Sequence, residues 1–166
     1  MACFNNNNIN NTNVERFEDD YLIGLQDLAS QTVLADGVIG IGDVYRRFCR
    51  KNSCGTKVFD NTSTGVTLNW NGIYRVTATL VGTGTEAGDV TVQLFSNGLA
   101  VPGAISTQTI TTPDTEFRTF VIEKFILVNN AEVLGCNSTL AQTLTLENTG
   151  VGATFTNVTF DVVKVV

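Results

Sequence analysis

The chain has 166 residues, 16% of them charged, and a formal net charge of −6. This acidic balance argues against a dedicated nucleic-acid-binding protein, which usually shows a basic stripe, and no apolar run reaches the roughly 18 residues of a transmembrane helix. Because the sequence has no histidine, triads with a histidine base and mixed cysteine/histidine metal sites are also excluded.

The chain begins with a polar tract, residues 1–14, which includes seven asparagines and no pattern that builds a core. We expect a tail that is disordered or ordered by a partner. The first residues lack the basic and apolar regions of a signal peptide, so synthesis in the cytoplasm is expected.

Two short helices are predicted before residue 57. Over residues 15–28, apolar side chains recur at helical spacing and acidic residues occupy the first turn. Over residues 43–51, Val44 and Phe48 are predicted to point inward, and basic residues crowd the last turns. The glycine-rich residues 33–42 between them support no firm assignment. The first helix has a small apolar stripe, so we expect it to dock on another surface.

Half of the ten basic residues fall between Arg46 and Lys57. One interpretation is a solvated helix end whose cations compensate the helix dipole. The other is an electrostatic contact with an acidic partner surface, a second subunit of the same protein included.

From residue 57 onward, short alternating segments separated by turn residues predict strands. The predicted strands are Lys57–Phe59, Val66–Trp70, Ile73–Val81, Val90–Phe95, Ile105–Ile110, Phe117–Val128, Leu140–Glu147 and Phe155–Val165. Their number and spacing predict a β-sandwich or jelly roll over residues 58–166, preceded by an arm over residues 1–57.

Several predicted strands carry apolar side chains on both faces, whereas a sandwich needs only one apolar face per sheet. The surplus predicts a surface buried against a partner, most simply in a homo-oligomer. The alternative is a shift of register at bulges, for example near Glu123 and Lys124, which would return some of these side chains to the core.

Four segments resemble the trimeric jelly roll of the tumour-necrosis-factor and complement-C1q type: Gly72–Val76, Val92–Gly98, Val101–Ala104 and Phe155–Lys164. They resemble more closely still the small proteins of tailed bacteriophages that join an N-terminal attachment segment to a C1q-like sandwich. The resemblance implies an all-β, TNF/C1q-like jelly roll with a short, partly helical N-terminal arm. It also implies a head fibre or capsid decoration protein.

In the trimeric family, the sheet with the third, sixth and last strands faces the threefold axis. The resemblance therefore implies a trimer interface that includes Ile73, Phe117, Val121, Phe125, Phe155 and Val163. The arm would attach to the particle, with Phe17, Tyr21, Leu25, Arg46, Arg47 and Arg50 as candidate contacts.

No reaction centre is predicted. A phosphate-binding loop is absent, and Glu86 and Asp89 beside the loop Gly82–Gly88 offer too few oxygens for a firm calcium site. Cys3, Cys49, Cys54 and Cys136 match no zinc-binding spacing, and Cys49 and Cys54 are expected as free thiols or, in an oxidising medium, as a disulfide. We expect no enzyme activity, metal or cofactor.

The leading hypothesis is a homotrimeric structural protein on the capsid surface of a virion, bound to the major capsid protein or another virion protein. The alternative is a C1q-like adhesion module that binds glycans or proteins of the host surface. Its contacts would come from the loops Gly82–Gly88 and Asn129–Cys136, because loops on a rigid sandwich often bind ligands.

Overall fold

A computed structural model describes residues 21–48, 57–129 and 141–165. Over these ranges the chain forms twelve strands and no helix. The strands are β1 (Tyr21–Asp27), β2 (Gln31–Val33), β3 (Gly37–Ile39), β4 (Asp43–Phe48), β5 (Phe59–Asn61), β6 (Gly65–Leu68), β7 (Gly72–Gly84), β8 (Gly88–Ser96), β9 (Leu99–Ile110), β10 (Arg118–Val128), β11 (Gln142–Asn148) and β12 (Ala153–Lys164). No helix long and apolar enough to cross a membrane occurs in these ranges.

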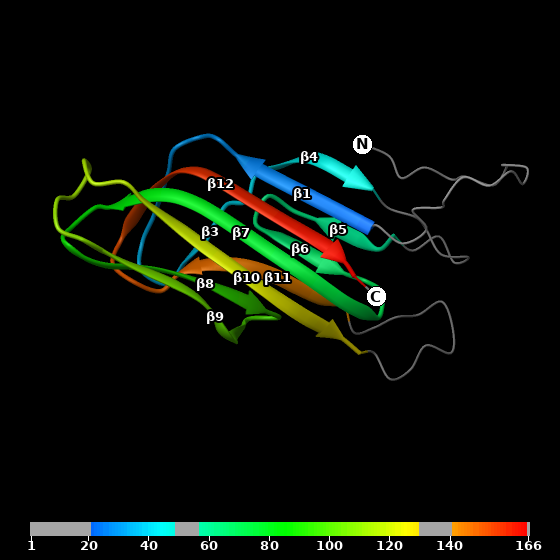
Figure 1. Cartoon of the computed structure of the whole chain (residues 1–166). Helices are drawn as coiled ribbons and strands as arrows, with labels where there is room; N and C mark the ends of the chain where they lie inside the picture. The colour runs from blue at the N-terminus through cyan, green and yellow to red at the C-terminus, as the bar shows by residue number, and fades with distance from the viewer. Residues whose placement is uncertain (1–20, 49–56, 130–140, 166) are drawn as a thin grey trace, which may run out of the picture.

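The strands form two antiparallel sheets that pack face to face (Figure 1). Sheet A has the order β10-β7-β12-β1-β4, and β2 pairs with β12 at its end. Sheet B has the order β5-β6-β11-β8-β9, and β3 pairs with β11. In sheet A, the last strand β12 thus lies in the middle, between β7 and β1.

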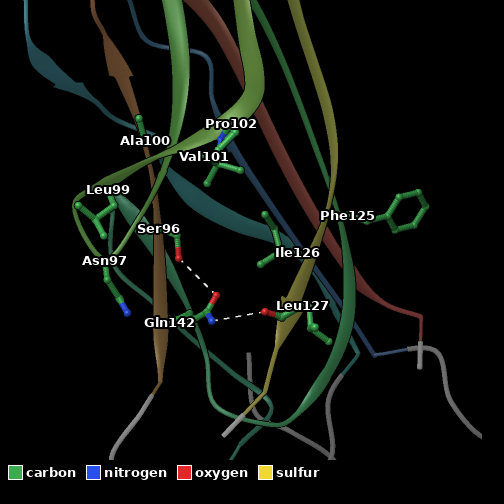
Figure 2. A pocket seen from close by; sticks show the side chains of 10 residues that line it. All are labelled: Ser96, Asn97, Leu99, Ala100, Val101, Pro102, Phe125, Ile126, Leu127 and Gln142. Carbon is green, nitrogen blue, oxygen red and sulfur yellow. Dashed lines mark hydrogen bonds between the residues drawn. The ribbon is translucent and has the colours of Figure 1, made fainter.

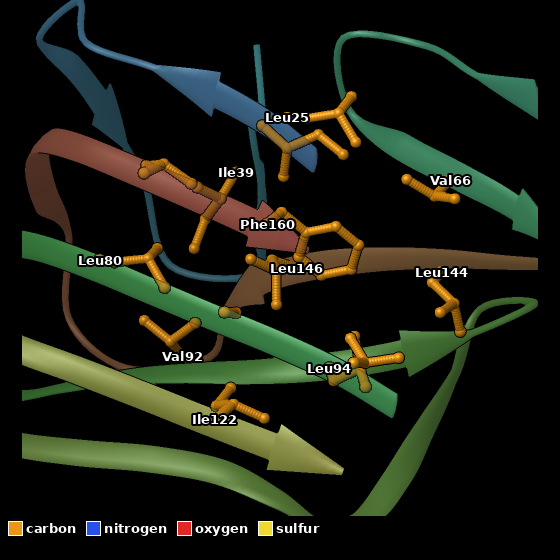
Figure 3. Packing of buried hydrophobic residues seen from close by; sticks show 14 of the residues in the cluster. Leu25, Ile39, Val66, Leu80, Val92, Leu94, Ile122, Leu144, Leu146 and Phe160 are labelled. Atoms are coloured by element: carbon orange, nitrogen blue, oxygen red, sulfur yellow. The ribbon is translucent and has the colours of Figure 1, made fainter. Parts of the chain in front are cut away.

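The core lies between the sheets and follows from alternation along the strands. In β7, Tyr74, Val76, Ala78 and Leu80 are fully buried, while the residues between them face outward. Figure 3 shows Leu80, Val92, Leu146 and Phe160 meeting between the layers. The hairpin between β8 and β9 turns at Asn97 and Gly98, whose φ angles of 50° and 75° suit the two-residue turn that matches strand twist.

All eight strands predicted after residue 57 are present with shifted ends, which confirms the jelly-roll prediction. The helix predictions are wrong where the structure can test them. Residues 21–27 form β1, and residues 43–48 form β4. Side chains four residues apart, such as Tyr21 and Leu25, share one face in a helix and in a strand alike, so their spacing does not distinguish the two. Phe17 and residues 49–51 lie outside the described residues.

The first strands belong to the sandwich. β1 pairs with β12, β2 pairs with β12, and β3 pairs with β11. Their side chains fill the core, since Ile23, Leu25, Ile39 and Ile41 are fully buried. The sandwich therefore includes residues 21–48, and the expected separation of an arm over residues 1–57 does not hold for them.

The turn between β9 and β10 is held by one carboxylate. Glu116 Oε2 accepts hydrogen bonds from the backbone N–H of Thr111 (2.7 Å) and Thr112 (3.0 Å) and from the Thr111 hydroxyl (2.9 Å). Its other oxygen accepts one from Arg118. These donors, the two backbone N–H groups first, lower the pKa of Glu116 to about 2.

This turn makes the first testable prediction. Because the folded-state pKa of Glu116 lies below its ordinary value of 4.5, its contribution to stability is present above pH 4.5 and is lost as the pH falls through about 2. We expect the melting temperature of the wild type to fall more between pH 5 and pH 2 than that of Glu116→Gln, measured by circular dichroism. Parallel curves for the two proteins would contradict this role.

Candidate functional site

The outer face of sheet A is the candidate site. Because opposed residues of antiparallel strands lie on the same face, the register defines two neighbouring rows across all five strands. The aromatic row consists of Phe125, Arg75, Val163, Leu22 and Phe48, and the charged row of Glu123, Thr77, Asp161, Gly24 and Arg46.

Large apolar side chains stand out from this face. Phe125 is 59% exposed, Phe48 56% and Val121 55%, and Leu127 and Ile73 are also exposed. They come from three strands of one sheet, and Val163 between them is half-buried. A face of this kind on a folded domain is typical of a protein–protein contact.

A bulge in β4 places a tyrosine ring over the middle of the outer face of sheet A. The pairing of β1 with β4 shifts between Gly24 and Leu25, which leaves Tyr45 as the extra residue. Its ring lies over Gly24, where an added Cβ would come within 2.8 Å of the ring, and its hydroxyl donates a hydrogen bond of 2.7 Å to Asp161 Oδ1. That hydrogen bond to the carboxylate is the main cause of a raised pKa for Tyr45. The Asp161 carboxylate therefore already has a hydrogen-bond partner within its own subunit.

The outer face of sheet B is different in kind. Threonine hydroxyls pair across its strands, Thr67 with Thr143 and Thr91 with Thr107, each at 3.0 Å. Thr109 donates to Asp89 at 2.6 Å. Polar pairs of this sort are stable in contact with water. The two outer faces therefore suit different surroundings, sheet A a protein surface and sheet B solvent.

A groove of 430 Å³ lies beside β10, between the start of β9 and the end of β10 (Figure 2). Leu99, Val101 and Pro102 line it from β9, and Gln142 joins the two sides by accepting from Ser96 and donating to the Leu127 carbonyl. Figure 2 shows the Phe125 ring directed away from the other residues of the groove. The groove is mainly apolar and borders the outer face of sheet A through Phe125 and Leu127.

Most residues predicted for a trimer interface lie on this face. Ile73, Val121 and Phe125 are exposed there, Val163 is half-buried there, and Phe117 is exposed just before β10. The prediction for Phe155 is wrong, because its side chain is fully buried and packs edge-to-face on Phe120 at 6.0 Å.

The reason is a bulge in β12. The register of β12 with β7 shifts between Phe155 and Asn157. Phe155 therefore faces the core although Val163, an even number of residues away, faces outward. A bulge reverses the inward and outward alternation beyond it, and nothing in the local sequence marks its position.

The residues predicted for attachment are scattered. Leu25 is fully buried in the core and is not available to a partner. Tyr21 packs on Trp70 at 5.4 Å, and Arg47 donates to the Phe59 carbonyl. Only Arg46, of the candidates that the structure describes, stands exposed on the outer face. Phe17 and Arg50 lie outside the described residues.

Phe48 is a surface residue that the sequence patterns did not indicate. The helical interpretation of residues 43–51 places its side chain on the inner side, whereas it is exposed at the end of β4. In a strand over residues 43–48, Arg46 and Phe48 lie on one face. That alternation is the signal by which Phe48 could have been found.

The loops predicted for adhesion are only partly described. Gly82–Gly88 is tied to the β11–β12 turn, because Thr85 donates from its backbone N–H (2.8 Å) and its hydroxyl (3.0 Å) to the Gly152 carbonyl. Asn129–Cys136 lies outside the described residues from residue 130 onward, as do all four cysteines. No cluster of three or more metal-binding side chains occurs among residues 21–48, 57–129 and 141–165.

The sequence matches no family model and no curated protein. Solved structures nevertheless share the fold. The globular domain of zebrafish complement 1qA aligns at TM-score 0.57 and 7% identity, over 88% of this chain and 98% of that one. The Eiger TNF of S. frugiperda aligns at TM-score 0.61 and 10% identity, over 90% and 94%.

The PRD1 vertex protein P5 aligns at TM-score 0.49 and 14% identity, over 89% and 97%, a score too low to carry an argument. At these identities the likeness establishes the fold alone. The fold is the TNF/C1q-like jelly roll, as the resemblance implied.

Proposed function

We propose that the protein is a homotrimeric structural component of a virion, a head fibre or capsid decoration protein of a tailed bacteriophage. The observation that carries the self-association is the exposed apolar face of sheet A, whereas the outer face of sheet B carries hydrogen-bonded threonine pairs beside the exposed Ile105. The trimeric jelly-roll resemblance supports three copies. The place on a virion rests on the resemblance of the four sequence segments to phage proteins.

The energetic argument for association is direct. Burial of a large apolar side chain contributes about 1.5–3 kcal/mol, and each copy offers several half-exposed ones on one face. In a trimer this face would be removed from water while the threonine face of sheet B stays solvated. Attachment to the capsid is then assigned to residues 1–20, because residues 21–48 are used to build the sheets.

Solution mass tests this proposal. We expect the wild type to sediment at three times the 17.9 kDa of one chain. Val121→Asp places a carboxylate in the contact and should weaken association on the order of a hundredfold or more, because an unpaired charge is costly to bury. Circular dichroism should show an unchanged fold, since Val121 lies outside the core.

A matched control is Ile105→Asp. Ile105 is 50% exposed, close to the value for Val121, but it belongs to sheet B. This variant should remain trimeric. A wild type that is monomeric at micromolar concentration would refute the proposal, and so would a trimer that both substitutions leave intact.

A further inference from the structure

The two edges of sheet A carry complementary side chains at the same height. β10 forms one edge and presents Glu123 and Phe125, while β4 forms the other and presents Arg46 and Phe48. The register places Glu123 and Arg46 at the two ends of the charged row. It places Phe125 and Phe48 at the two ends of the aromatic row.

The charges at the ends of the row have no carboxylate or cation partner among the described residues. Glu123 and Arg46 are both exposed, and neither takes part in an ion pair there. The Arg46 guanidinium lies over the Phe48 ring, 5.6 Å from its centre, so this cation and this ring form one unit. The two ends of the row are about 19 Å apart across the sheet, four spacings between neighbouring strands, which prevents a bond within one subunit.

We propose that the β10 edge of one copy contacts the β4 edge of the next, with Glu123 paired to Arg46 and Phe125 packed against Phe48. This inference rests on the self-association proposed above and specifies how the copies meet. The occupant of each edge is a second copy of this chain because one edge supplies the anion and aromatic ring that complement the cation and aromatic ring of the other.

The same pattern disfavours other arrangements. A twofold contact centred on two β10 edges would bring two Glu123 carboxylates together, and one centred on two β4 edges would bring two Arg46 side chains together. A contact between unlike edges is head-to-tail. Because both ends of each row lie at the same height along the strands, repeated contacts need no rise along the strands, which favours a closed ring over a filament.

A charge exchange in the full-length protein tests the pair. The dissociation constant of the oligomer would be measured by sedimentation for the wild type, Glu123→Arg, Arg46→Glu and the double variant. Each single reversal opposes like charges and should weaken association on the order of tenfold to a hundredfold, whereas the double variant should return to within about threefold of the wild type. Glu86→Arg, in the exposed turn before β8, is the matched control and should change nothing.

The outcomes separate this inference from the proposed function. A trimeric wild type that is indifferent to the single reversals, or a double variant as weak as the singles, overturns the edge contact and leaves the trimer intact. A monomeric wild type overturns both. Melting curves of all variants show whether each is folded, and because Glu123 and Arg46 are exposed, no loss of fold is expected.

Discussion

Deletion of residues 1–57 is expected to prevent folding of the sandwich. The deletion removes β1 to β4 and with them four fully buried side chains, those of Ile23, Leu25, Ile39 and Ile41. Loss of a buried leucine or isoleucine side chain alone costs about 2–5 kcal/mol. Four such losses together are comparable in size with the about 5–15 kcal/mol by which a domain of this kind is stable.

Expression and circular dichroism would measure the effect. The deletion also removes the strand that pairs with one side of β12 and makes β12 an unpaired edge strand, so we expect insoluble protein. The matched control variant lacks only residues 1–20 and keeps all twelve strands, so it should fold and associate but fail to attach to the particle. A soluble, folded sandwich without residues 1–57 would show that β1 to β4 are dispensable.

Replacement of Asn148 by alanine should cost about 2–4 kcal/mol of unfolding free energy. Asn148 is fully buried, and its amide nitrogen donates to the carbonyls of Val33 (3.3 Å), Leu34 (3.4 Å) and Val151 (2.7 Å). Its amide oxygen accepts from the Gly150 N–H at 3.3 Å. The side chain thus joins the β2–β3 turn to the β11–β12 turn, and its loss removes all of these hydrogen bonds from a buried site.

Asn157 provides the control, because its buried side-chain oxygen has no hydrogen-bond partner among the described residues. Asn157→Ala should leave stability nearly unchanged or raise it. Urea denaturation of both variants would give the two free energies. Equal losses at Asn148 and Asn157 would contradict the account of Asn148.

Much of the sandwich was predictable because alternation and turn chemistry are local. Tyr74 to Leu80 in β7 alternate cleanly, and Asn97-Gly98 marks a hairpin by its residue types alone. β1 and β4 were not predictable in this way. Their apolar residues fit a helical repeat, and only the pairing of β1 with β12 across the length of the chain, and of β4 with β1, decides for strands.

The candidate site shows the same division. The excess of apolar residues on β7 and β10 was visible in the sequence, and so was its meaning as a contact surface. The inward orientation of the Phe155 side chain was not visible in the sequence, because it depends on a bulge whose position is set by pairing with β7. The match between Arg46 and Glu123 was equally hidden. It exists only once five strands, far apart in the chain, are placed in register.

The central position of β12 has a consequence for synthesis. Until this strand leaves the ribosome, no strand of sheet A pairs β7 and β10 on one side with β1 and β4 on the other. Contacts between such distant segments form slowly, because the intervening chain must be ordered first. The nascent protein therefore carries two halves of sheet A that are not yet paired with each other. We expect it to depend on chaperones during this interval.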